Sequence, residues 1–152
     1  MTSKSPPPGP AGAAQRLVRQ TAQLGAVLDE AADKAAAQAG LTRADVDVVQ
    51  ALHRARGGRL TPSEVAAACG LSSGGTSNIV RRLATSGYLT REANESDGRS
   101  SWVQLTEEGA ALAGSIGASV DDGHARLLRR LPDGLADELL DALERTLEHL
   151  GR

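Results

Sequence analysis

A short polar stretch, residues 72–82 (SSGGTSNIVRR), holds the side chains of this 152-residue chain best suited to bind a ligand. Asparagine can bond the edge of an adenine, arginine the edge of a guanine or a phosphate, and serine a phosphate. A step of about 100° per residue along a helix separates two faces. Those expected in the core are Thr76, Ile79, Val80 and Leu83, and those on the opposite side are Gly74, Asn78, Arg81 and Thr85, flanked by Ser77 and Arg82. This polar face indicates contact with a nucleic acid, with a merely solvated surface as the alternative.

The distribution of charge supports the same interpretation. The net charge of the chain is −2, but residues 1–53, 54–106 and 107–152 carry 0, +3 and −5. Every basic residue of the middle third is an arginine. A basic segment inside an acidic protein is typical of a site for a polyanion, although a charged face exposed only to water would look similar.

Catalytic and cofactor sites are not indicated. The SSGGTSN stretch lacks the Gly-Lys-Ser/Thr ending with which a phosphate-binding loop holds a nucleotide. His53, His124 and His149 are far apart, without a nucleophile motif, and with Cys69 they show no metal-ligand spacing. We expect Cys69 to be a buried small hydrophobic residue rather than a redox sensor. The sequence therefore predicts no enzyme, no cofactor and no metal.

The compartment is predicted from what could carry the chain into or across a membrane. No apolar run is long enough to span a bilayer, and the opening MTSKSPPPGPAGAAQ lacks the apolar segment of a secretory signal. A single cysteine cannot form an internal disulfide, which agrees with a reducing compartment. We expect a cytoplasmic protein without a membrane partner.

Helices before the polar stretch are predicted from apolar spacing and capping residues. Residues 1–12 are rich in Pro, Gly and Ser and predict a disordered arm, and a helix follows over 13–39, ended by Gly40. Thr42 is expected to cap a second helix that runs to about residue 55, followed by a turn at 56–60. Thr61, with Pro62 and Glu64 after it, starts a short helix over 62–69.

After the polar stretch the apolar period changes. Extended runs at 88–91 and 101–105 flank the polar segment EANESDGRS and predict a β-hairpin with a long tip. Thr106 is expected to cap a helix to about residue 131, and Pro132 to start a last one. Leucines on one side of that last helix, at 135, 139, 143, 147 and 150, form either an internal core stripe or a dimer seam.

Together these elements have the order of a winged helix-turn-helix. Such a motif needs a small residue where its two helices cross, a glycine in the turn and an apolar packing set. Ala66 is the small residue, Gly70 is in the turn, and the packing set is Val65, Cys69, Leu71, Thr76 and Ile79. The predicted fold is mainly α with a small β-hairpin.

Residues 60–112 resemble the MarR (multiple antibiotic resistance regulator) transcription factors. The resemblance is carried by Asp97-Gly98-Arg99 followed by Val103-x-Leu105-Thr106-x-x-Gly109, and SSGGTSN is similar to a family variant. It implies one winged-helix domain over 13–152, with a DNA-binding part at 41–106 and dimerisation helices at 13–39 and 107–152. It also implies a homodimer that binds a pseudo-palindrome in double-stranded DNA, with a recognition helix at 72–82 in the major groove and wing tips at the minor groove or backbone.

Carried over by position, the resemblance assigns the site residues. Those expected to contact DNA are Ser72, Ser73, Gly74, Ser77, Asn78, Arg81, Arg82 and Arg99. Arg99 is the wing arginine, and Asp97 is expected to hold the wing through an arginine such as Arg91. Arg81 departs from the family pattern, which often has an acidic residue there. Gly74 is expected to let the helix backbone approach DNA closely.

Two further hypotheses concern what else binds. Many members of the family release DNA when a small aromatic acid binds between the two parts, but this chain has few aromatic residues to stack on such a ring. Arg16, Arg19 or His53 could instead meet an anionic effector. The alternative to a repressor is a winged-helix protein-interaction adaptor that binds no DNA, and steep salt dependence of binding distinguishes the two.

Overall fold

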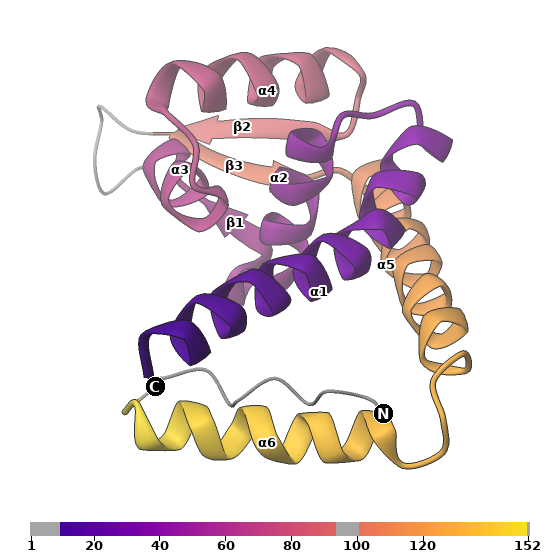
Figure 1. Ribbon diagram of the computed structural model, residues 1–152. Helices are drawn as coiled ribbons and strands as arrows, with labels where there is room; N and C mark the ends of the chain where they lie inside the picture. The colour runs from indigo at the N-terminus through magenta and orange to yellow at the C-terminus, as the bar shows by residue number, and fades with distance from the viewer. Residues whose placement is uncertain (1–9, 94–100, 152) are drawn as a thin grey trace, which may run out of the picture.

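Glycines, prolines and capping side chains divide the chain into helices and short strands, which the computed structural model describes for residues 10–93 and 101–151 (Figure 1). The helical elements are α1 (Pro10–Gln38), α2 (Arg43–Arg54), the 3-10 turn η1 (Arg56–Gly58), α3 (Pro62–Cys69), α4 (Ser73–Thr85), α5 (Glu107–Leu128) and α6 (Leu135–His149). The strands are β1 (Arg59–Leu60), β2 (Leu89–Ala93) and β3 (Ser101–Leu105). The predicted order of a winged helix-turn-helix between terminal helices is confirmed.

Local capping explains where α2 and α3 begin. The Thr42 hydroxyl accepts the Asp45 backbone N–H, and the Asp45 carboxylate accepts the Thr42 N–H at 2.9 Å. Thr61 and Glu64 form the same reciprocal box at the start of α3. Each such cap contributes about 1 kcal/mol to stability. At the end of α3, Gly70 takes the left-handed conformation (φ 63°) that turns the chain toward α4, as predicted.

The sheet has one strand more than the sequence analysis expects. The predicted hairpin pairs β2 with β3, and the short β1 adds to the other side of β3 to give the order β1-β3-β2. The prediction of a turn over all of 56–60 is therefore wrong for Arg59 and Leu60. So short a strand cannot show an alternating pattern, and its partners, Val103 and Gln104, lie far along the chain.

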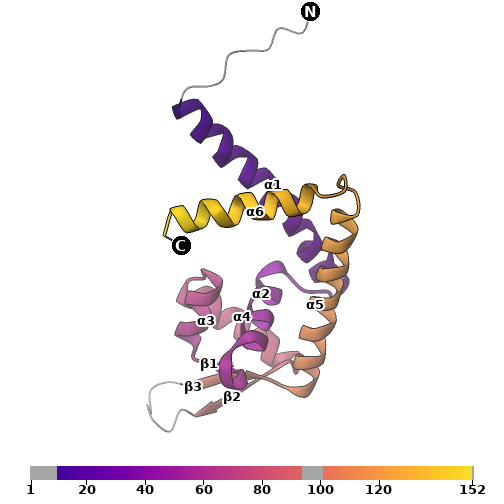
Figure 2. The ribbon, with the colours of Figure 1, turned by 90° about the horizontal axis from the view of Figure 1, so that it is seen from below.

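A core of aliphatic side chains holds together the winged-helix lobe, which we define as residues 41–93 and 101–106. The lobe residues without exposed surface come from α2, α3, α4 and β3: Val48, Val49, Leu52, Val65, Val80 and Val103. Seen from below in Figure 2, α2, α3 and α4 gather on one side of the sheet, and α5 runs from its edge toward α6. This shared core holds α2, α3 and α4 in fixed positions relative to one another.

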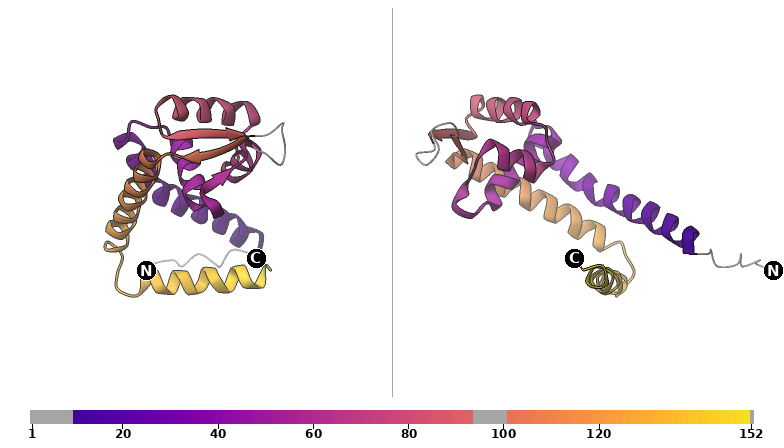
Figure 3. Two further views of the ribbon diagram at one scale, coloured as in Figure 1. Left: turned by 180° about the vertical axis from the view of Figure 1, so that it is seen from behind. Right: turned by 90° about the vertical axis from the view of Figure 1, so that its left-hand side faces the viewer.

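Outside the lobe, α1 and α5 cross, and α6 lies apart (Figure 3). A second, smaller core of Ala35, Ala36, Val46 and Ile116 joins α1 and α5 to α2. At the crossing, a Cβ atom on Gly123 would come within 2.7 Å of the Ala31 Cβ, so only glycine allows this approach. In contrast, α6 has no buried residue. Among the described helices, none combines the length and the hydropathy that a membrane crossing requires.

The first and last helices begin at other residues than predicted, and α5 ends at Leu128 rather than near residue 131. The predicted arm reaches residue 12, but helix α1 already begins at Pro10. Proline is accepted there because the N–H groups of the first helical turn have no helical partner. The rest of that predicted arm lies outside the described residues. The last helix begins at Leu135 rather than at Pro132, because Gly134 in the left-handed region (φ 79°) breaks the turn between them.

Candidate nucleic-acid interface

Helix α4 presents the polar face that the sequence predicts. Ser72 caps it, with its hydroxyl accepting the Gly75 backbone N–H at 3.2 Å. The side chains of Thr76, Ile79, Val80 and Leu83 are buried in the lobe. The predicted contact residues on α4 and at its cap are exposed: Ser72, Ser73, Gly74, Ser77, Asn78, Arg81 and Arg82. Their polar groups therefore lie along one open helix face.

The two glycines of α4 differ in what surrounds them. A Cβ atom on Gly75 would come within 3.2 Å of the Ser72 hydroxyl, which ties this glycine to the cap. A Cβ atom on Gly74 would meet nothing within 4 Å, and Gly74 does not have a positive φ. The fold of the single chain therefore does not require glycine at position 74.

Asn78 and Arg81 touch each other on the exposed face. The Arg81 guanidinium donates to the Asn78 side-chain oxygen in a short hydrogen bond one helical turn apart. This contact leaves the Asn78 amide NH₂ and the remaining Arg81 donors available to an outside acceptor. These two of the side chains predicted to contact DNA thus form one unit.

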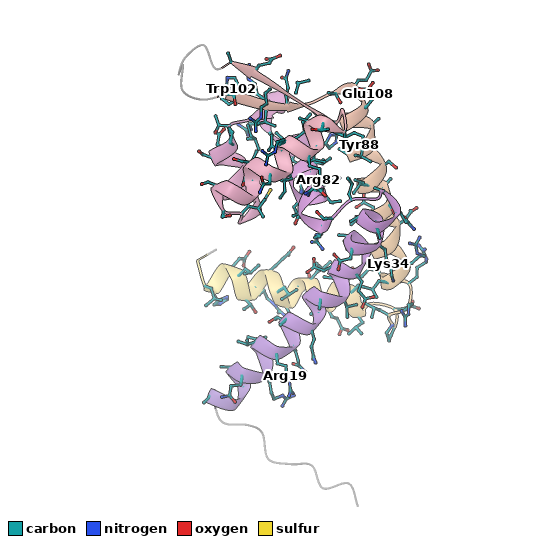
Figure 4. All side chains as sticks on the ribbon, turned by 90° about the horizontal axis from the view of Figure 1, so that it is seen from above. Arg19, Lys34, Arg82, Tyr88, Trp102 and Glu108 are labelled. Carbon is teal, nitrogen blue, oxygen red and sulfur yellow. The ribbon has the colours of Figure 1, made fainter. Side chains whose placement is uncertain are left out.

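Arg82 has a partner that the sequence analysis did not foresee. Its Nη2 atom lies 2.5 Å from Asp45 Oδ1, so the ion pair joins α4 to the first turn of α2. Figure 4 labels Arg82 where α4 lies beside α2. Asp45 is 1% exposed. Burial alone would raise the pKa of Asp45, but the Thr42 hydrogen bonds and the Arg82 guanidinium hold that pKa below its usual range. The carboxylate is therefore ionised at neutral pH.

The described part of the wing, strands β2 and β3, contacts its neighbours in the lobe through two side-chain interactions, one from β3 and one from the residue that follows it. Arg59 of β1 lies over the Trp102 ring of β3, 4.8 Å from its centroid, in a cation–π contact. The Thr106 hydroxyl donates to the Gly87 carbonyl at 2.7 Å, which fixes the start of α5 beside the hairpin. Arg91 is exposed on β2, opposite Val103. Arg99 and Asp97, the predicted wing arginine and its support, lie outside the described residues.

A second ion-pair cluster joins α2 to α1. The Arg43 guanidinium contacts Asp29 at 2.9 Å, Asp33 at 3.2 Å and Asp47 at 3.1 Å, and these contacts raise its pKa. The sequence analysis recognised Thr42 and Asp45 as a cap but assigned no role to Arg43. The i,i+4 spacing of Arg43 and Asp47 is the one local signal for this cluster.

Cys69 and His124 lie on different helices, α3 and α5. Cys69 is half-buried against the lobe core, and burial raises the pKa of its thiol. His124 lies 3.1 Å from the Leu28 carbonyl, across the contact of α5 with α1. Residues 10–93 and 101–151 contain no cluster of three or more His, Cys, Asp or Glu that could hold a metal ion.

Two cavities open beside α1. The larger, about 730 Å³, lies between α1 and α5, and the smaller, about 390 Å³, lies between α1, α2 and α5. His124 lines both. The smaller is also lined by Arg43, Asp47, Gln50 and Arg54. The residues suggested to meet an anionic effector, Arg16, Arg19 and His53, line neither.

Known proteins are similar to this chain in both sequence and fold. The HTH-type transcriptional repressor Rv2887 of Mycobacterium tuberculosis is 32% identical over 129 residues, which cover 85% of this chain and 88% of the relative. A structure of AbsC, a MarR family regulator from Streptomyces coelicolor, is 26% identical with a TM-score of 0.70 and covers 91% of this chain and 95% of AbsC.

Solved structures of E. coli MarR share the fold at lower identity. The apo form is 23% identical with a TM-score of 0.73, covering 93% of this chain and 99% of its own. A mutant complexed with operator DNA is 22% identical with a TM-score of 0.70, covering 92% and 99%. The sequence model described as the MarR family matches residues 39–100. Because the match to the repressor extends over most of both chains and the family model covers nearly all of the lobe, the chain belongs to the MarR family.

Proposed function

We propose that the chain is a homodimeric transcriptional repressor that binds operator DNA through the exposed face of α4. The observation that carries the proposal is that this face holds Asn78, Arg81 and a bare Gly74 beside one another, while its opposite side is locked in the lobe core. The curated relatives are named as repressors, and a MarR protein of the same fold was solved with operator DNA. For such a DNA-binding protein we propose action in the cytoplasm.

The side chains of α4 divide by what they can bond. Asn78 and Arg81 have the groups that recognise base edges, an amide and a guanidinium, and they lie one turn apart. Ser72, Ser73 and Ser77 can bond phosphates and set the register of the helix. Arg99, with Arg91 and Asp97 supporting the wing, is proposed to contact the backbone or minor groove.

The partner proposed for the terminal helices is a second copy of the chain. In α6, Leu135, Leu139 and Leu147 are 38 to 50% exposed, so these side chains have no core within the chain, and the internal-stripe interpretation fails. Burying each would contribute about 1.5–3 kcal/mol. A two-fold dimer then matches a two-fold operator.

Charge complementarity suggests where the partner's α6 lies. The larger cavity, between α1 and α5, is lined by three basic residues, Lys34, Arg126 and Arg130, and by apolar side chains such as Leu127. One carboxylate, Glu30, also lines it and lies 3.7 Å from Lys34, so the basic groups outnumber the acidic one. Helix α6 carries five acidic residues and one arginine within 135–149. An amphipathic acidic helix fits a groove that is both apolar and basic, so we propose that the α6 of each protomer covers this cavity of the other.

The smaller cavity is the proposed site of a small-molecule effector. Its walls come from α1, α2 and α5, and thus from both the dimerisation helices and the lobe. A ligand there would contact Gln50, which lines the cavity. The Gln50 amide donates to the Ala113 carbonyl at 2.7 Å and so joins the lobe to α5. Release of DNA would follow if ligand binding favoured a different angle between the lobe and the helices α1 and α5.

Selection of bound duplexes from a random library by the full chain tests this function. We expect enrichment of a two-fold symmetric site and a steep loss of affinity as salt rises, because phosphate contacts release counterions. Asn78→Ala should change the base preference at one position of each half-site, whereas Arg99→Ala should weaken binding to most sequences. Failure to enrich any sequence, with salt-insensitive retention, would instead support the adaptor without DNA binding.

A further inference from the structure

Arg82 differs from the other exposed polar residues of α4 because its guanidinium is held inside the protein. Its Nη2 atom bonds Asp45 Oδ1, and the side chain is 52% exposed whereas that of Asp45 is 2% exposed. Arg81, its neighbour, bonds Asn78 of the same helix, and among residues 10–93 and 101–151 its side chain has no hydrogen-bond partner outside α4. The two adjacent arginines, both assigned to DNA contact from the sequence, therefore have different surroundings.

Asp45 is itself fixed in place. Its Oδ2 atom accepts the Thr42 backbone N–H at 2.9 Å and the Thr42 hydroxyl at 2.7 Å. This leaves Oδ1 for Arg82. A buried carboxylate without a partner is costly, so removal of the guanidinium would leave a charge that the lobe cannot solvate well. The pair is thus a stable and directional contact between the first turn of α2 and the last turns of α4.

The contact is directional, whereas most of the other packing of α4 is not. Its other buried side chains are the aliphatic Ile79, Val80 and Leu83, which attract without strong directional preference, and Thr76, whose hydroxyl bonds Ser72 at the cap of the same helix. On a helix whose side chains reach about 5–6 Å from the axis, a rotation of about 10° moves the contact atoms by about 1 Å. A bidentate contact of Asn78 or Arg81 with a base edge does not tolerate much more.

We propose that Arg82 is a positioning residue, whose ion pair with Asp45 sets the rotation of α4 so that Asn78 and Arg81 meet the bases. The proposal rests on the proposed function of α4. It also extends toward α1, because Arg43, in the same turn of α2, binds Asp29 and Asp33 of α1. One helical turn therefore orients the recognition helix relative to the dimerisation helix.

Operator binding by the full chain, measured for single and double variants, tests this role. Arg82→Gln and Asp45→Asn should each weaken binding to the selected operator about tenfold, the scale of one misplaced base contact. The double variant should be no weaker than either, because both changes break one pair. Asp45→Asn combined with Arg81→Gln is the matched control, and its two effects should add.

Two readouts separate positioning from a phosphate contact and from simple unfolding. The slope of log affinity against log salt should stay unchanged in Arg82→Gln, whereas loss of a phosphate contact lowers it by about 0.9. Binding to random-sequence DNA should also stay unchanged, whereas a partly unfolded variant would lose it as well. Arg82→Lys keeps the charge but lacks the planar fork, so it should restore operator binding only in part.

Several results would overturn the proposal. Tighter or unchanged operator binding by Asp45→Asn would mean that freeing Arg82 is harmless and that this arginine serves DNA directly. A reduced salt slope in Arg82→Gln, or additive effects in the double variant, would lead to the same conclusion. Absence of any operator for the unaltered protein is a different result, because it rejects the function of α4 itself.

Discussion

The winged-helix lobe and helix α6 differ in whether their apolar side chains are buried within the chain. Six aliphatic residues of the lobe core have no exposed surface, whereas no residue of α6 is buried. Both segments show clear apolar periodicity, and α6 has acidic residues in its first turn, where the helix dipole favours them. The lobe therefore completes its core within one chain, whereas the leucines of α6 stay exposed in the single chain, and we propose that a second copy covers them.

The largest expected effect comes from a charge placed in the leucine side of α6. Leu139→Asp should weaken the dimer at least a hundredfold, because each dimer loses two buried leucines, worth about 1.5–3 kcal/mol each, and gains two buried charges. Sedimentation equilibrium measures the change. Asp141→Asn, on the opposite side of α6, is the control and should leave the dimer intact. An unaltered dimer in Leu139→Asp would show that α6 is not the seam.

A cavity in the lobe core should act on folding instead. Leu83 is 1% exposed, and Leu83→Ala should lower the free energy of unfolding by about 2–5 kcal/mol. Thermal or urea unfolding measures this loss, and Leu140→Ala, at a residue 56% exposed within the single chain, is the comparison. If the lobe and the seam are independent, Leu83→Ala leaves the dimer association constant nearly unchanged under folding conditions. Equal loss of dimer would contradict the separation.

Gly74 allows folding and DNA binding to be separated within the lobe. Because nothing lies within 4 Å of a Cβ atom there, Gly74→Leu should leave stability equal or slightly higher, by up to about 0.8 kcal/mol of helix propensity. Operator affinity should fall at least tenfold, because the side chain keeps the helix from approaching the base edges. Gly74→Ala should show a smaller loss. Normal operator binding by the leucine variant would remove close approach as the reason for this glycine.

The smallest expected effect is the acid response of the lobe. The folded state holds the pKa of Asp45 below its ordinary value of 3.8, so Asp45 stabilises the lobe above that pH, and this contribution is lost as pH falls through the folded-state pKa. Unfolding measured between pH 6 and about pH 3 should therefore be less steeply pH-dependent in Asp45→Asn than in the unaltered chain. Identical pH profiles would show that the ionised carboxylate of Asp45, held by Thr42 and Arg82, contributes nothing to stability.

Local signals explain what could be predicted from sequence. Thr42 and Thr61 each precede a carboxylate at the spacing of a capping box, and both form the expected caps. The rotation of about 100° per residue correctly separates the buried and exposed sides of α4. These features depend on residues within one or two turns, so they need no knowledge of the tertiary fold.

Features that depend on distant partners were missed. Asp45 and Arg82 are 37 residues apart, and the sequence around either residue contains no pattern that predicts their contact. Strand β1 exists only because β3 offers it a free edge. The roles of Arg81 and Arg82 therefore could not be distinguished from their types and spacing, since the difference comes from how α4 lies on α2.

Helix α1 crosses α5 at Gly123, and a small change of the crossing angle there would move the far end of α1 by a large distance. The part of α1 from Ala31 back to Pro10 spans about 32 Å, at about 1.5 Å per residue. A change of about 5° at this pivot would move the far end of such a helix by about 3 Å. Because α1 also contacts α2 through Arg43, we expect the crossing angle at Gly123 to determine how far apart the two α4 helices lie in the proposed dimer, and therefore which half-site spacing they span.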